Sequence, residues 1–232
     1  MQQKLVIIGN GMAPGRMLEH LFETAPDEFQ VTIFNAEPRV NYSRLMLSPV
    51  LSGEKTYADI ITHDEDWYES HGVTLHKGAR VTEIDRVART VHAENGLSAD
   101  YDQLVIATGS DPFIIPIPGA DLPGVLTYRD LDDVERMLDV AKDGGRAVVI
   151  GGGLLGLEAA AGLREQGMDV TVLHLMPTLM ERQLDPAAGY LLEKAFRDRG
   201  IDVRTKANSH RIVERDGRAA GVELDDGTLI PA

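Results

Sequence analysis

The chain has 232 residues, enough for one large or two modest domains, and its 43% hydrophobic and 26% charged content is typical of a folded globular protein. Its 37 acidic residues outnumber its 23 lysines and arginines, and a formal charge of −14 argues against a nucleic-acid partner. It contains no cysteine, its apolar runs are too short to cross a membrane, and no signal-peptide pattern precedes the first strand, so we expect a cytoplasmic protein whose redox chemistry belongs to a bound cofactor.

The chain opens with a predicted strand, a tight turn and a helix. Residues 4–9 form a continuous apolar run that ends in glycine, and residues 15–25, "GRMLEHLFETA", carry apolar positions at helical spacing. Residues 30–34, "QVTIF", predict a second strand. This order is a βαβ unit, which implies a parallel sheet.

The next segments predict short elements. Residues 41–53 are interpreted as an irregular loop or short helix. Residues 62–67, "THDEDW", are interpreted as a helix start rather than a metal site, because their spacing matches no ligand pattern. Residues 101–110, "YDQLVIATGS", predict a buried strand that ends in glycine. Further short strands are expected at residues 73–75, 79–84 and 90–92.

A proline-rich segment at residues 111–124 is the candidate linker between two domains. Beyond it, Asp130 is the predicted N-cap of a helix that ends near Lys142. The opening pattern then repeats, which predicts a second nucleotide-binding unit and an α/β fold. The repeated elements are a strand at 146–150, a glycine turn at 151–156, a helix at 157–166 and a strand at 170–174, followed by a helix at 185–200, a strand at 201–204 and a hairpin at 211–230.

The second glycine turn has the full pattern of a dinucleotide cradle. The first glycine of such a turn allows a tight bend, the second lets backbone N–H groups approach the pyrophosphate, and the third permits close packing of helix on strand. Gly151, Gly153 and Gly156 fill these three places between a strand and a helix. That context makes the pattern specific.

The first glycine turn departs from the pattern at its third place. Gly9 and Gly11 are present, but Pro14 stands where a glycine is usual. Proline costs little in the first turn of a helix, because the N–H it lacks has no intrahelical acceptor there. We therefore expect an altered but working cradle, in which Met12 and Ala13 supply N–H donors and Gly15 takes over close packing.

An acidic residue after the second strand of each unit should bind the adenosine ribose. Glu37 stands at that place in the first unit, with a solvated loop glutamate as the alternative. In the second unit the place holds His174, which leaves the choice between NADH and NADPH open. Arg182 is either a phosphate partner or a surface arginine.

Two cradles with "ATGS" at residues 107–110 between them resemble the flavoprotein reductases of the pyridine nucleotide-disulphide oxidoreductase type. Three longer segments, "FNAEPRVNYSRLMLSPVLSGEKTY", "LPGVLTYRDLDDV" and "HLMPTLMERQLDPAAGYLL", resemble the amino-terminal part of the large subunits of assimilatory NAD(P)H nitrite reductases. The resemblance implies FAD in the first cradle and NAD(P)H in the second. It also implies that Arg44 contacts the flavin side, Val81 the adenine, and Thr108 and Gly109 the FAD.

The resemblance implies two Rossmann-like three-layer domains, the second inserted in the first, with the carboxyl-terminal part of the fold missing. We expect an FAD-binding domain at 1–115 and an NAD(P)-binding domain, lacking its last strand, at 116–232. No catalytic side chain and no metal ligand are expected. The expected cofactor-binding residues are Gly9, Gly11, Met12, Ala13, Pro14, Gly15, Glu37, Arg44, Val81, Ala107, Thr108, Gly109, Gly151, Gly153, Leu154, Leu155, Gly156 and His174.

The function implied is the diaphorase portion of a nitrite reductase, which passes hydride from NAD(P)H to FAD and electrons to a downstream siroheme and iron–sulfur centre. A small nitrite reductase subunit and a second copy of the chain are the implied protein partners. The alternatives are a reductase of a separate small redox protein and a dinucleotide-binding fragment without turnover. In relatives that reduce ferredoxins a lysine follows the Leu-Ser pair and faces the position of Glu158; here Pro49 follows Ser48, which argues against that branch.

Overall fold

The computed structural model describes residues 2–232 and divides them into two compact units. Among these residues the first unit comprises 2–44 and 57–110, and the second comprises 45–56 and 111–232. The predicted domain boundary between residues 115 and 116 lies within the second unit, and the assignment of residues 45–56 to that unit was not predicted. No helix among the described residues is long and apolar enough to span a membrane.

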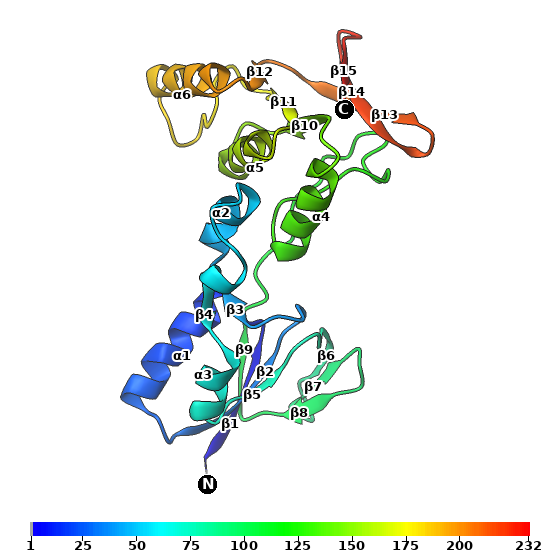
Figure 1. The fold of residues 1–232 in the computed structure, drawn as a ribbon. Helices are drawn as coiled ribbons and strands as arrows, with labels where there is room; N and C mark the ends of the chain where they lie inside the picture. The colour runs from blue at the N-terminus through cyan, green and yellow to red at the C-terminus, as the bar shows by residue number, and fades with distance from the viewer. Residues whose placement is uncertain (1) are drawn as a thin grey trace. The chain divides into compact units, whose positions relative to one another are not determined.

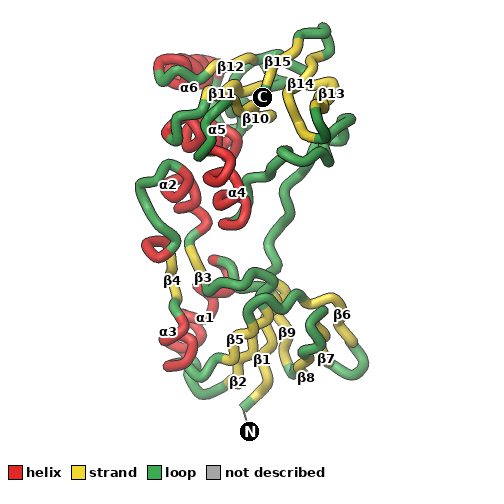
Figure 2. The backbone as a smooth tube through the Cα atoms, turned by 45° about the vertical axis from the view of Figure 1, so that its right-hand side comes forward, coloured by secondary structure: helices red, strands yellow, loops and turns green. Residues whose placement is uncertain are grey.

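The first unit is built on a parallel four-stranded sheet (Figures 1 and 2). The strands follow the order β5-β2-β1-β9, and β1 pairs with β2 through Ile8 and Phe34 at their carboxyl ends. Their bounds are Gln3–Ile8 for β1, Phe29–Phe34 for β2, Thr74–His76 for β5 and Gln103–Ile106 for β9. The βαβ prediction for the start of the chain is confirmed.

Alternate residues of β1 build two cores, because successive strand side chains point to opposite faces. Leu5 and Ile7 pack with Leu18 of helix α1 (Met12–Thr24) and Tyr68 of helix α3 (Glu65–Ser70). On the other face, Val6 and Ile8 lie in a core with the antiparallel sheet β6-β7-β8. That sheet comprises β6 (Val81–Asp85), β7 (Thr90–Ala93) and β8 (Ser98–Asp100). The sheet with its two coverings makes three layers (Figure 1).

Short elements complete the first unit. Strand β3 (Asn41–Tyr42) pairs with β4 (Ile61–His63), and the 3-10 helix η2 (Ala58–Ile60) precedes β4. Helix α3 begins after Asp64, whose carboxylate accepts from the N–H of Trp67 at 2.9 Å, so the helix-start interpretation of residues 62–67 is confirmed.

One strand prediction is wrong in its burial. Residues 103–106 form β9 as expected, but Gln103 and Ile106 are exposed, and Ile106 keeps 62% of its surface. Among the described residues β9 is an edge strand whose only partner is β1. Apolar sequence predicts a buried strand but does not tell which neighbour covers it.

The second unit repeats the parallel plan with the sheet β10-β11-β12. These strands run over Arg146–Ile150, Asp169–Leu173 and Asp202–Arg204. The unit's helices are α2 (Leu47–Leu51), α4 (Leu131–Ala141), α5 (Leu154–Glu165) and α6 (Pro186–Asp198), and the 3-10 helix η1 (Arg44–Met46) leads into α2. As predicted, Asp130 caps α4, because its side chain accepts from the N–H of Asp133 at 2.9 Å.

A second, antiparallel sheet covers part of this unit. Strands β13 (Ser209–Arg215), β14 (Arg218–Leu224) and β15 (Leu229–Pro231) form a meander, where the sequence predicted a hairpin. Val222, Leu224 and Ile230 pack against Leu173 of β11.

Candidate dinucleotide-binding sites

The first glycine turn is closed by backbone contacts that only glycine permits. The N–H of Gly9 donates to the carbonyl of Phe34 at 2.8 Å, and the residue has φ +106°, in the left-handed region. A Cβ on Gly9 would lie 2.3 Å from the carbonyl oxygen of Ala107. The turn after β1 and the "ATG" segment after β9 therefore lie against each other, and Gly109 also adopts a positive φ of 77°.

Proline is accommodated in the first cradle. Gly11 caps helix α1, which begins at Met12 and contains Pro14 in its first turn. A Cβ on Gly11 would meet no atom within 4 Å, whereas one on Gly15 would lie 3.0 Å from Nδ2 of Asn41. Gly15 therefore makes a close contact, as expected, but against the β3 segment rather than against β1. The N–H groups of Met12 and Ala13 belong to the first turn of a helix, where no intrahelical acceptor exists.

Asn41 and Asn10 order this cradle, and sequence reasoning missed both. Nδ2 of Asn41 donates to the carbonyls of Asn10 and Gly11 at 2.9 and 2.6 Å, which leaves the N–H side of the turn for a ligand. Oδ1 of Asn10 accepts from the hydroxyl of Tyr68 at 2.9 Å, but its buried Nδ2 has no partner in the structure. An unsatisfied buried donor is costly, and an acceptor oxygen bound in the turn would satisfy it.

Glu37 is part of an ion-paired cluster and not a solvated loop residue. Its carboxylate accepts from the hydroxyl of Tyr42 at 2.7 Å and pairs with Arg44. The Glu37 and Arg44 side chains are only 20% and 26% exposed. The N–H of Gly78 donates to the carbonyl of Glu37 at 3.0 Å. This bond holds the segment just before β6, whose first residue is Val81, beside this cluster.

The second cradle repeats the first in its backbone. The N–H of Gly151 donates to the carbonyl of Leu173 at 2.8 Å, Gly151 has φ +123°, and Gly153 caps helix α5. A Cβ on Gly153 would meet no atom within 4 Å, whereas one on Gly156 would lie 2.1 Å from the carbonyl oxygen of Gly151. The first two glycines thus leave space for a ligand, and the third allows the helix to approach the turn.

Helix α5 begins at Leu154, three residues before the predicted start at Leu157. The prediction was wrong because it assigned the whole glycine pattern to the turn, whereas Gly153 is already the N-cap and Gly156 lies in the first helical turn. Leu154 and Leu155 are 54% and 47% exposed at the opening of the cradle.

His174 follows β11 and is buried, with both ring nitrogens engaged. Nδ1 lies 3.1 Å from the backbone nitrogen of Gly152, and Nε2 lies 3.0 Å from a carboxylate oxygen of Glu181. A hydrogen bond from its own backbone N–H and one from His174 lower the pKa of the Glu181 carboxyl. Glu181 was not predicted from the sequence, although it lies within the segment "HLMPTLMERQLDPAAGYLL" that carries the family resemblance. The next residue, Arg182, is exposed.

Ser48 joins helix α2 to helix α5. Its hydroxyl donates to Glu158 at 2.6 Å and lies 3.2 Å from the hydroxyl of Tyr128. Burial raises the pKa of Tyr128. Glu158 therefore accepts from the neutral hydroxyl of Ser48, which in turn lies beside Tyr128.

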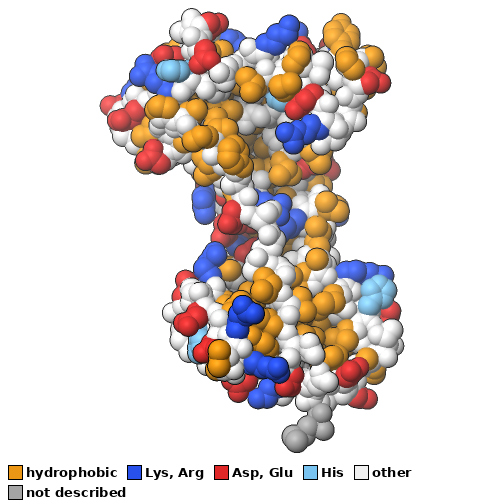
Figure 3. All heavy atoms as spheres, turned by 180° about the vertical axis from the view of Figure 1, so that it is seen from behind, with side chains coloured by type: hydrophobic (Ala, Val, Ile, Leu, Met, Phe, Trp, Pro, Cys, Tyr) orange, Lys and Arg blue, Asp and Glu red, His pale blue; other side chains and the backbone are white. Residues whose placement is uncertain are grey.

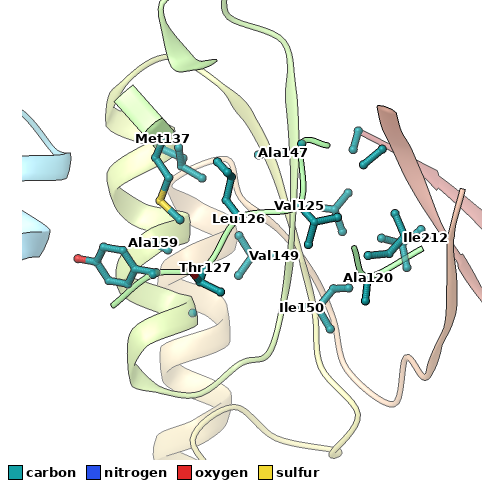
Figure 4. A pocket seen from close by; sticks show the side chains of 18 of the residues that line it. Ala120, Val125, Leu126, Thr127, Met137, Ala147, Val149, Ile150, Ala159 and Ile212 are labelled. Carbon is teal, nitrogen blue, oxygen red and sulfur yellow. The ribbon is translucent and has the colours of Figure 1, made fainter. Parts of the chain in front are cut away.

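A cavity of about 510 Å³ lies against the edge of β10 in the second unit. Figure 4 shows Ala147, Val149 and Ile150 of β10 facing it together with Met137 of α4 and Ala159 of α5. Among the described residues β10 pairs only with β11, so its other edge is open. The apolar lining offers little to a pyrophosphate, and the cavity suits protein side chains better.

The surface charge agrees with the composition. On the face of residues 2–232 that Figure 3 shows, Lys and Arg side chains are interspersed with Asp and Glu and form no continuous stripe. This face therefore offers no track for a polyanion.

Comparison with known proteins identifies what this chain is similar to. Residues 3–232 match the family described as pyridine nucleotide-disulphide oxidoreductase. The chain is 47% identical over 231 residues to a nitrite reductase [NAD(P)H] of Bacillus subtilis, covering 100% of this chain and 29% of that protein. It is 43% identical to the assimilatory nitrate reductase electron transfer subunit of the same organism, covering 100% and 30%.

Solved structures agree in fold. A ferredoxin reductase from Rhodopseudomonas palustris superimposes with a TM-score of 0.91 at 28% identity, covering 99% of this chain and 57% of that one. The present chain thus spans under a third of the two curated relatives and about half of this solved structure.

Proposed function

Because this chain belongs to the pyridine nucleotide-disulphide oxidoreductase family, we propose that it is the diaphorase part of an NAD(P)H-dependent nitrite reductase. The observation that carries the proposal is the duplicated cradle. Gly9 and Gly151 make equivalent backbone hydrogen bonds to the end of the neighbouring strand and both have a positive φ, and Gly11 and Gly153 both cap a helix beside open space. Two such cradles in one chain suit a pair of dinucleotides.

The residues present fit both groups. In the first cradle, the N–H groups of Met12 and Ala13 and the unpartnered Nδ2 of Asn10 would donate to FAD phosphate oxygens, while Glu37 and Arg44 would line its adenosine and flavin sides. In the second, the N–H groups of Leu154 and Leu155 would receive the pyrophosphate of NAD(P)H.

The protein's share of the chemistry is binding and orientation. When bound, the two cofactors supply hydride and electron transfer, so no side-chain nucleophile or general base is required. The "ATG" segment, Ala107 to Gly109, would close against the flavin side of the first cradle, since Ala107 already touches Gly9. Val81 would contact the adenine through its backbone.

Further parts of the protein complete the proposal. A siroheme and an iron–sulfur centre would lie in a segment beyond these residues, because this chain has no cysteine ligand for a cluster. The open edges of β9 and β10, and the apolar cavity beside β10, would accept further strands if the FAD-binding and NAD(P)-binding domains each lack a segment. A small nitrite reductase subunit, a second copy and a cytoplasmic location belong to the same proposal.

A second candidate is a reductase of a separate small redox protein, which the likeness to a ferredoxin reductase structure favours. The hydrogen bond from the Ser48 hydroxyl to Glu158 and the presence of Pro49 favour the nitrite reductase. The test is the visible absorption spectrum of the protein after incubation with FAD and removal of free flavin, followed by anaerobic NADH. A retained band that NADH bleaches supports a diaphorase, and reoxidation by nitrite only when this chain is part of a longer protein with a siroheme centre supports the first candidate. If no flavin is retained, the chain is a dinucleotide-binding fragment without turnover.

A further inference from the structure

The second cradle has no acidic residue directly after β11, but a carboxylate from a later loop, that of Glu181, lies close to this place. The residue that follows β11, His174, is only 8% exposed. A backbone N–H can only donate, so Nδ1 of His174 accepts from Gly152, and the proton of the neutral ring is therefore on Nε2. Nε2 then donates to the carboxylate of Glu181 at 3.0 Å. The imidazole ring of His174 therefore occupies the place expected for the acid, and the Glu181 carboxylate lies directly behind this ring.

The segment that carries Glu181 is anchored to the cradle. The N–H of Met180 donates to the carbonyl of Gly152 at 3.0 Å, and Met180 adopts φ +50°, which is uncommon for a residue with a side chain. Leu179 is fully buried, and a Cβ on Gly152 would lie 2.5 Å from its Cδ2. These contacts fix the backbone on both sides of Gly152, so Glu181 is held at the cradle.

The Glu181 carboxylate has capacity for a ligand. Its side chain is 28% exposed, in contrast to the buried ring that orients it. A carboxylate offers about four acceptor sites on its two oxygens, of which its own backbone N–H and His174 use two. A glutamate carboxyl is already ionised at neutral pH, and the hydrogen bonds to Glu181 lower its pKa further.

We propose that Glu181, positioned by His174, accepts from the adenosine ribose hydroxyls in the second cradle and makes the site selective for NADH over NADPH. This inference rests on the proposed function, since it requires that the second cradle binds the nicotinamide cofactor. A free 2′-hydroxyl donates to a carboxylate, whereas a 2′-phosphate brings a second negative charge against it. Arg182 follows Glu181 directly and its charge helps to lower the pKa of that carboxyl, but its own side chain is exposed, where solvent screens a charge strongly.

The test measures equilibrium binding of ADP-ribose and of its 2′-phosphate by calorimetry, with FAD present. Binding that disappears in Gly153→Ala is assigned to the second cradle. The wild type should bind ADP-ribose at least about tenfold more tightly than the 2′-phosphate, and Glu181→Gln should reduce that preference by about tenfold, or about 1.4 kcal/mol. Urea unfolding of Glu181→Gln checks that the fold is intact, and Arg182→Gln is the matched exposed control, with an expected change in preference below about twofold.

Two results overturn the inference while leaving the proposed function in place. One is a wild-type protein that binds both probes equally or prefers the 2′-phosphate. The other is a preference that survives in Glu181→Gln or that depends on Arg182. If neither probe binds the second cradle, the proposed function fails, and the inference fails with it.

Discussion

Gly156, the third glycine of the second cradle, should contribute to the stability of the fold, whereas Gly153 in the same turn should contribute to ligand binding. In Gly156→Ala the added Cβ would lie 2.1 Å from the carbonyl oxygen of Gly151, whereas contacts below 3.0 Å are essentially never seen, so helix and turn must part by nearly an ångström. Overpacking of this kind costs about 1–3 kcal/mol, and the better helix propensity of alanine returns up to about 1 kcal/mol. We expect a loss of roughly 1–2 kcal/mol in the free energy of unfolding, measured by urea titration with circular dichroism.

Gly153→Ala is the matched control within the same turn. Its Cβ meets no atom within 4 Å and its φ of −86° is open to any residue, so the unfolding free energy should change by less than about 1 kcal/mol. The same methyl group stands where a pyrophosphate would approach, so NADH affinity should fall by about tenfold or more in a fluorescence titration. A Gly156→Ala protein as stable as the wild type, or a Gly153→Ala protein with unchanged NADH affinity, would refute this reasoning.

Three further predictions concern the first unit. Pro14→Ala should change the unfolding free energy by less than about 1 kcal/mol, because the first helical turn does not need the missing N–H; a loss above about 2 kcal/mol in urea titration would show that the ring itself is required. Tyr68→Phe removes the donor to Oδ1 of Asn10 and should cost about 1–3 kcal/mol. Burial raises the pKa of Tyr68 to about 12, so the stability that the neutral hydroxyl contributes is complete below the unfolded pKa near 10 and is lost as pH rises through 12. The unfolding free energy of Tyr68→Phe should therefore depend less on pH than that of the wild type between these two values. Equal dependence would contradict the assignment. Arg44→Gln leaves the partly buried Glu37 without its ion pair and should cost about 1–3 kcal/mol, of which Glu37→Gln in the same chain should restore part; a double variant as unstable as the sum of the single ones would show that the pair is not coupled.

The sequence predicted the features that depend on local spacing. Gly9, Gly11, Gly151 and Gly153 stand between an apolar strand and a helix, and their roles follow from backbone geometry that a few neighbouring residues determine. The cap at Asp130 is local in the same way. The repeat itself could be found because both cradles use the same short pattern.

The features that the sequence did not predict depend on contacts between distant residues. Asn41 donates to the carbonyls of Asn10 and Gly11, although helix α1 and strand β2 lie between them in the sequence. The residues next to Asn41 do not indicate this contact. The exposure of β9 depends on which strand lies beside it, and the carboxylate at the second cradle arrives from a loop, at Glu181, and not from the strand end. The segment 45–56 joins the second unit although it follows elements of the first.

The central claim is that the first cradle holds FAD and the second the nicotinamide cofactor. The most direct test compares the visible spectra of the wild type, Gly11→Ala and Gly153→Ala after incubation with FAD, removal of free flavin and anaerobic addition of NADH. We expect that the wild type retains flavin that NADH bleaches, that Gly11→Ala loses the flavin, and that Gly153→Ala keeps a flavin that NADH no longer bleaches. Full flavin retention in Gly11→Ala, or undiminished bleaching in Gly153→Ala, would contradict it.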